Sequence, residues 1–159
     1  MMPNAQNRGG ASVGVLMHLE PWEADLIVTL RLWCSTPDGQ ARVWNEFAMT
    51  LPKGKATGEM RAFEELVSTV AHYAHRPLVR HSVGCACIGA DEGVFAHLVR
   101  VASEGDLGEA AQVATLLVTA AQAERVALLA AQVGCARKSI TRARLADRAA
   151  RADNVIRLH

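Results

Sequence analysis

Aromatic side chains are scarce in this chain, and long apolar runs are missing. Phe, Trp and Tyr make up 4% of the 159 residues, although 50% of all residues are hydrophobic. The apolar content is mainly alanine, valine and leucine, which suits closely packed helices better than a β-sandwich. The longest uncharged run, residues 110–123, is shorter than the roughly 20 apolar residues that cross a bilayer. We therefore expect no transmembrane helix and no membrane partner.

The net charge and the number of cysteines are also low. A net charge of +1 produces no global field that would draw the molecule to nucleic acid or to an acidic membrane surface. Four cysteines at uneven spacing are too few for a disulfide-dense secreted scaffold. The first residues lack the pattern of a secretory signal. Together these features favour a reducing compartment, and we expect a cytoplasmic protein.

Apolar residues recur at helical spacing along most of the chain. Four amphipathic helices are predicted over residues 21–34, 37–51, 60–75 and 91–104, and a weaker one over 139–152. The predicted fold class is all-α, a compact bundle of about five to six helices. The alternative is an α+β fold with an N-terminal β-hairpin at residues 24–51, because residues 28–32 alternate with period two and Pro37-Asp38-Gly39 is a good hairpin turn.

The most apolar helix is predicted over residues 107–133. Its polar residues form a narrow stripe, which is typical of a helix at the centre of a bundle or in a subunit interface, and Gly134 is expected to end it. The stripe consists of Gln112, Thr115, Thr119 and Gln122.

Three segments are expected along the chain. Residues 1–18 mix polar residues and glycine without periodicity, which predicts a flexible N-terminal tail. Residues 19–135 form the helical domain. Residues 136–159 form a basic C-terminal helix or tail.

The short segment His81-Ser82-Val83-Gly84-Cys85-Ala86-Cys87 is the most informative for chemistry. Its imidazole and two thiols are ligand types that suit zinc, which makes His81, Cys85 and Cys87 candidate metal ligands. The C-x-C spacing is narrower than the usual zinc pair, and no second pair follows. A fourth ligand would have to come from elsewhere in the chain, and the candidates are Cys34, Cys135, His75 and Asp91. Two other interpretations stay open: the cysteines pack as small buried hydrophobes, or they form a redox-active thiol pair.

Signatures of catalysis are missing. No nucleophile elbow, phosphate-binding loop or zinc-protease motif is present, and no cysteine lies in a protease-like context. The adjacent acids Asp91 and Glu92 are interpreted as a helix start or a solvated face. The sequence therefore favours a protein that is not an enzyme.

The C-terminal segment carries a local excess of positive charge. Residues 135–159 contain seven basic and two acidic residues, a local net charge of +5. On a helix, Arg137, Arg144, Arg148 and Arg151 would lie along one stripe, which would suit a phosphate backbone.

Three functional hypotheses follow. The first is a small helical interaction or regulatory protein with a protein partner or a second copy of itself. The second is a zinc-binding protein that uses the loop of His81, Cys85 and Cys87. The third is a nucleic-acid-associated regulator that binds through residues 136–159.

Overall fold

The structure, a computed structural model, describes residues 5–157. This range holds six α-helices and one two-stranded sheet, so the chain is a mainly helical bundle, as predicted. In chain order the helices are α1 (Pro21–Ser35), α2 (Pro37–Thr50), α3 (Ala56–Tyr73), α4 (Ala90–Ser103), α5 (Leu107–Ala114) and α6 (Ala123–Ile156). The strands are β1 (Ser12–Val15) and β2 (Cys87–Gly89), and they pair antiparallel.

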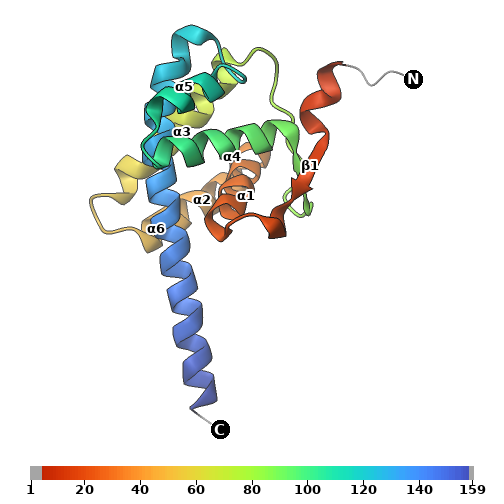
Figure 1. Cartoon of the computed structure of the whole chain (residues 1–159). Helices are drawn as coiled ribbons and strands as arrows, with labels where there is room; N and C mark the ends of the chain where they lie inside the picture. Colours follow the sequence, from red (N-terminus) through yellow and green to blue (C-terminus); the bar gives the residue numbers. More distant parts are fainter. Residues whose placement is uncertain (1–4, 158–159) are drawn as a thin grey trace.

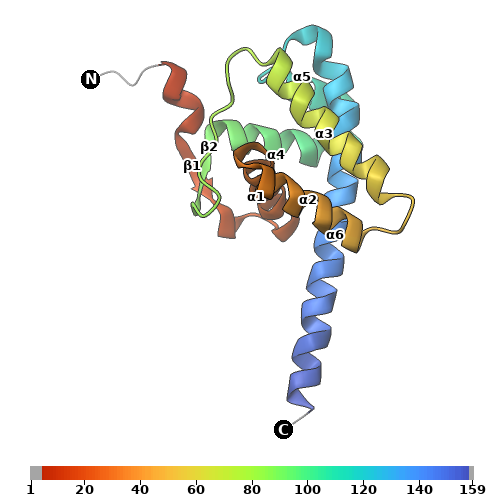
Figure 2. The ribbon, with the colours of Figure 1, turned by 180° about the vertical axis from the view of Figure 1, so that it is seen from behind.

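Helix α6 is the axis of the bundle. It packs against α3, α4 and α5 and also meets α1 and α2, whereas its C-terminal part extends alone from the body (Figures 1 and 2). The core between these helices is made of fully buried apolar side chains, among them Leu26, Ile27, Met60, Phe63, Leu66, Phe95, Leu98, Val126 and Ala130.

The predictions for the first four helices are confirmed, and the hairpin alternative is wrong. Pro37, Asp38 and Gly39 form the first turn of α2 and do not close a hairpin. Thr36 is the N-cap residue, since its side-chain oxygen accepts a hydrogen bond from the Gly39 N–H at 3.0 Å. Proline in the first helical turn loses no hydrogen bond, because the N–H there has no intrahelical partner.

The single helix predicted over residues 107–133 is interrupted. Helix α5 ends at Ala114, and the chain then forms backbone hydrogen bonds with the end of α3: His75 N–H donates to Leu117 O, and Thr119 N–H donates to Tyr73 O. Because residues far away in the sequence supply these bonds, the local apolar pattern does not reveal the break.

Gly134 does not end a helix, contrary to the prediction. It is buried within α6 where this helix crosses α4, and a Cβ at this position would lie 2.5 Å from the Cβ of Ser103 and 3.0 Å from the carbonyl oxygen of Val99. The missing side chain therefore allows the two helices to approach closely.

The two ends also differ from expectation. The sequence predicts a flexible tail over residues 1–18, but from residue 5 on this segment holds a 3-10 helix (Ala5–Gly10), strand β1 and a second 3-10 helix (Leu16–His18). Residues 1–4 lie outside the described residues. At the other end, α6 passes through the expected boundary at residue 135 without a break. In the described part of the chain, no helix has the length and apolar character needed to cross a membrane.

Candidate functional site

A buried ion pair supports the loop that carries the cysteines. Arg31 of α1 and Glu92 of α4 have no exposed side-chain surface, and two hydrogen bonds join them: Nε to Oε1 at 2.7 Å and Nη2 to Oε2 at 2.8 Å. Buried charges are stable only when they are paired and hydrogen-bonded. This geometry fixes α1 against the first turn of α4.

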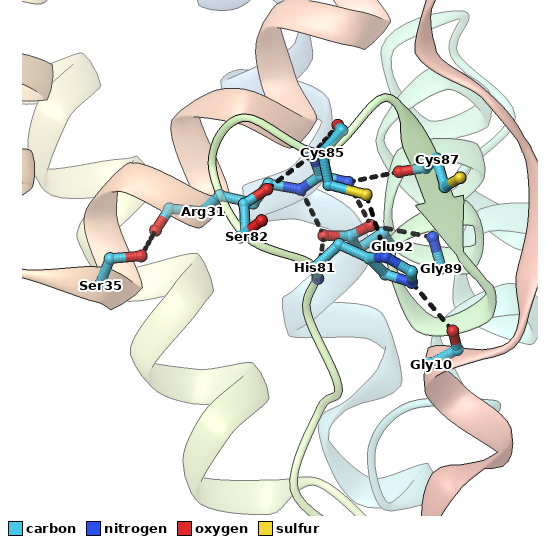
Figure 3. A network of polar contacts seen from close by, with 9 residues as sticks. All are labelled: Gly10, Arg31, Ser35, His81, Ser82, Cys85, Cys87, Gly89 and Glu92. Carbon is cyan, nitrogen blue, oxygen red and sulfur yellow. Dashed lines mark hydrogen bonds and ion pairs between the residues drawn. The ribbon is translucent and has the colours of Figure 1, made fainter.

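The remaining donors and acceptors of this pair bind the backbone of residues 81–89. Arg31 donates to the carbonyl oxygens of Ser82 at 3.2 Å, Cys85 at 2.7 Å and Cys87 at 2.6 Å. Glu92 accepts from the N–H groups of His81 at 3.0 Å and Gly89 at 2.9 Å. The loop that carries the candidate residues is therefore held by side chains from two helices (Figure 3).

Both members of the pair are charged. Burial raises the pKa of Glu92, but the hydrogen bonds from Arg31, Gly89 and His81 outweigh it, so the net pKa is below its ordinary value. The hydrogen bond to Glu92 raises the pKa of Arg31 above its ordinary value.

The imidazole of His81 faces the thiol of Cys85. Nδ1 lies 3.4 Å from Cys85 Sγ, and Nε2 lies 2.9 Å from the carbonyl oxygen of Gly10 (Figure 3). A carbonyl oxygen only accepts hydrogen bonds, so Nε2 carries a proton and Nδ1 is the nitrogen that meets the thiol. Gly10 thus orients the ring, as the third group does in nucleophile–base arrangements.

The surroundings of Cys85 favour its thiolate form. The backbone N–H of Cys87, the imidazole of His81 and the thiol of Cys87 hold the pKa of Cys85 below its ordinary value. The Gly10 carbonyl and then the Cys85 thiol raise the pKa of His81 above its ordinary value. The two shifts are opposite in direction, and both favour a thiolate beside an imidazolium. Cys85 and Cys87 are each partly exposed, so reagents can reach them.

The zinc prediction finds no support in this arrangement. In residues 5–157, no group of three His, Cys, Asp or Glu side chains is placed to hold a metal ion. Both ring nitrogens of His81 have partners, as described above. The four candidates for a further ligand also lie elsewhere: Cys34 lines a pocket beside α1, Cys135 is exposed on α6, His75 Nε2 is 2.8 Å from Thr115 O, and Asp91 binds Arg76.

Sequence reasoning missed Arg31 and Glu92, the two residues that organise the site. Asp91 and Glu92 lie in the first turn of α4, in agreement with the predicted helix start, but they are buried, with 6% and 0% of their surface exposed, and do not form a solvated face. Asp91 makes two hydrogen bonds to Arg76, at 2.8 and 2.9 Å, and accepts another from the Val79 N–H. The only sequence signal for Glu92 is its spacing three residues after Gly89, which is the spacing of a capping-box carboxylate. Nothing in the sequence indicates Arg31.

The predicted arginine stripe on α6 is partly occupied by internal ion pairs. Arg137 is buried and binds both carboxylate oxygens of Glu46, at 2.7 and 2.9 Å. Arg144 lies 2.6 Å from Asp25, and Arg151 lies 3.0 Å from Asp147. These pairs neutralise charge that a phosphate backbone would otherwise meet.

Comparison of this chain with protein-family models, with curated proteins and with solved structures gave no match.

Proposed function

We propose that this chain is a small thiol–disulfide redox protein in which Cys85 and Cys87 interconvert between the dithiol and the disulfide. The observation that carries the proposal is the contact of the His81 ring with Cys85 Sγ, at 3.4 Å, in a partly exposed loop where a second cysteine lies two residues further on. A thiolate attacks disulfides, whereas a thiol does not. Any regulatory role of this cycle would start from the dithiol form, since only that form provides the Cys85 thiolate.

The spacing of the cysteines supports the second half of the cycle. One residue, Ala86, separates the two cysteines, and Cys87 is the first residue of β2. Ile88, the next residue of β2, is buried in the core. We propose that Cys87 acts as the resolving thiol for Cys85.

The oxidation takes two steps with a small disulfide RSSR as oxidant. The Cys85 thiolate first attacks one sulfur of RSSR and breaks its S–S bond, and the departing RS⁻ takes a proton from the His81 imidazolium. Cys87 then passes its proton to the neutral ring and attacks the sulfur of Cys85. This step releases the second RSH, which takes its proton from His81. Two protein thiols are oxidised, and one RSSR is reduced to two RSH.

Glutathione disulfide is a suitable probe for this cycle. The reduced protein is incubated with glutathione buffers of fixed ratio, free thiols are blocked with iodoacetamide, and peptides are identified by mass spectrometry. We expect a disulfide between Cys85 and Cys87 in the wild type and in Cys135→Ser, the control that lacks the exposed cysteine of α6. Cys87→Ser should stop at a glutathione adduct on Cys85.

Two results would overturn the proposal. In one, Cys135 of the wild type reacts with glutathione disulfide as fast as Cys85 does. In the other, Cys87→Ser accumulates no adduct on Cys85.

One further observation favours a second role, the interaction protein that the sequence predicts. Residues 145–156 of α6 are exposed along their whole length. Four residues in this projecting part recur at spacings of four, three and four, as in the seam of two paired helices: Leu145, Ala149, Ala152 and Ile156. A second copy of the chain would cover this seam. Light scattering should then show a dimer that Ile156→Glu dissociates, and a monomeric wild type at high concentration would exclude the pairing.

A further inference from the structure

Apart from the thiol pair, the largely apolar pocket between α1, α3, α4 and residues 74–80 has the features of a small-molecule site. Its volume is about 440 Å³, within the range of about 300–1,000 Å³ that is typical of such sites. Its floor consists of the buried side chains of Leu30, Val67, Val70 and Phe95. Apolar groups that enter this pocket would leave water for a hydrocarbon surface.

The charged side chains of the pocket wall are all positive. Arg76 and Arg80 both line it, and no Asp or Glu does. Arg76 is occupied by its two hydrogen bonds to Asp91. Arg80 is exposed and has no ion-pair partner among residues 5–157. Its guanidinium is therefore free to bind an anion.

Cys34 adds a neutral group to the wall. Burial raises the pKa of this thiol above its ordinary value, although the nearby charge of Arg80 opposes the shift. The uncharged thiol behaves as a small apolar group, so Arg80 holds the one unpaired charge that the pocket offers.

We propose that this pocket binds a small apolar monocarboxylic acid, with the hydrocarbon tail on the floor and the carboxylate on Arg80. Arginine matches a carboxylate with two parallel N–H donors, which gives such a ligand both charge and geometric complementarity. An alkyl amine of the same length would place a positive charge beside Arg80, and an alcohol would leave the guanidinium unpaired.

Decanoate below its micellar concentration is the probe. We expect saturable binding in isothermal titration calorimetry, weaker binding of decanol and none of decylamine. Arg80→Gln should weaken decanoate binding about two- to fivefold, the effect expected for an exposed ion pair. Arg61→Gln, which removes another exposed arginine from α3 outside the pocket, should leave binding unchanged.

Two measurements keep the test independent of changes in folding. Ala71 is an exposed residue of the pocket wall, so Ala71→Phe fills the pocket without entering the core and should abolish binding at an unchanged melting temperature. In the wild type, decanoate should protect Cys34 from N-ethylmaleimide but not Cys135. Decylamine that binds as tightly as decanoate, or a decanoate affinity that neither variant lowers, would overturn the proposal.

Discussion

At the scale of single residues, the chemistry of this protein depends on contacts that are invisible in the sequence. His81 and Cys85 were recognised as chemically informative, but the interpretation as metal ligands rested only on residue type. Each nitrogen of the ring has its own partner, which favours proton transfer over metal binding. The sequence gives no sign that Arg31 is buried, and it predicts Glu92 only as part of a helix start or a solvated face. Their burial results from the packing of α1 against α4, which no local pattern encodes.

Replacing His81 by asparagine should slow the reaction of Cys85 with iodoacetamide at neutral pH. The hydrogen bond from the ring favours the thiolate, so we expect a loss of about tenfold in rate. Because the pKa of Cys85 lies below its ordinary value, the wild-type thiol should stay reactive as the pH falls below the usual thiol range, and the variant should not. The rate at Cys135, measured on the same samples by mass spectrometry, should be equal in both proteins. Equal rates at Cys85 would show that the ring has no role.

Glu92→Gln should strongly destabilise the fold, because it leaves the charge of Arg31 buried without a counter-ion. Removing one member of a buried pair typically costs about 3–5 kcal/mol. The matched control is Glu65→Gln, which breaks the exposed pair with Arg125, whose side chains are 48% and 51% exposed. That variant should change the free energy of unfolding by less than about 1 kcal/mol. Urea denaturation measures the free energy of unfolding of the two variants, and a similar loss of stability in both would contradict the prediction.

The same pair predicts a pH dependence of stability. The folded pKa of Glu92 is lower than its ordinary value, so its contribution is fully present above the ordinary carboxyl range and is lost as the pH falls through the folded pKa. The free energy of unfolding of the wild type should therefore decrease in acid. Glu92→Gln should show a smaller decrease over the same pH interval, and an identical slope would mean that Glu92 is not ionised in the fold.

At the scale of helices and strands, the sequence predicts well where the periodicity is local. The first four helices were predicted because their apolar residues follow the helical repeat. Errors occur where a tertiary contact overrides the local pattern. The apolar run after residue 107 predicts one helix, yet Thr119 and its neighbours form hydrogen bonds with the chain at the end of α3. Gly134 resembles a helix end in the sequence, yet it is a point of close approach between α4 and α6.

Two glycine-to-alanine variants should therefore have opposite effects. Gly134→Ala places a methyl group against Ser103 and the Val99 carbonyl, so we expect a loss of about 1–3 kcal/mol from overpacking. Gly58 also lies in a helix, α3, but nothing lies within 4 Å of a Cβ built there. Gly58→Ala should stabilise the protein by about 0.5 kcal/mol through helix propensity. Thermal unfolding of both variants tests these two predictions. If Gly134→Ala were as stable as the wild type, the close approach of α4 and α6 would be contradicted.

At the scale of the whole molecule, α6 consists of a packed part and an exposed part. Its 34 residues give a length of about 51 Å at 1.5 Å per residue, which exceeds the depth of the bundle (Figure 1). The first part completes the core, and the last part contributes no buried side chain after Thr141. The boundary that the sequence placed at residue 135 thus falls inside the packed part, because Arg137 and Ile140 are buried.

Truncation at two points should separate these parts. A chain that ends at Leu145 keeps every ion pair that α6 makes with another helix, so its free energy of unfolding should stay within about 1 kcal/mol of the wild type. A chain that ends at Ala136 loses Ile140 and leaves Glu46 without Arg137, which should cost about 3 kcal/mol or more. Chemical denaturation of the two truncated chains checks that the chain ending at Leu145 has the higher free energy of unfolding. Equal stabilities would show that the packed part ends earlier.

The position of Arg31 also affects how the protein is made. Its hydrogen-bond partners in the loop and in α4 lie 51 to 61 residues further along the chain, and His81 meets Gly10 across 71 residues. Contacts of such large sequence separation form only when the intervening chain has folded. During synthesis, the loop that carries Cys85 therefore stays without its anchor in α1 until Glu92 of α4 has been made. The hydrogen bond that orients the His81 ring likewise forms only when this loop docks against Gly10, so we expect the proposed reactivity of Cys85 to develop late in folding.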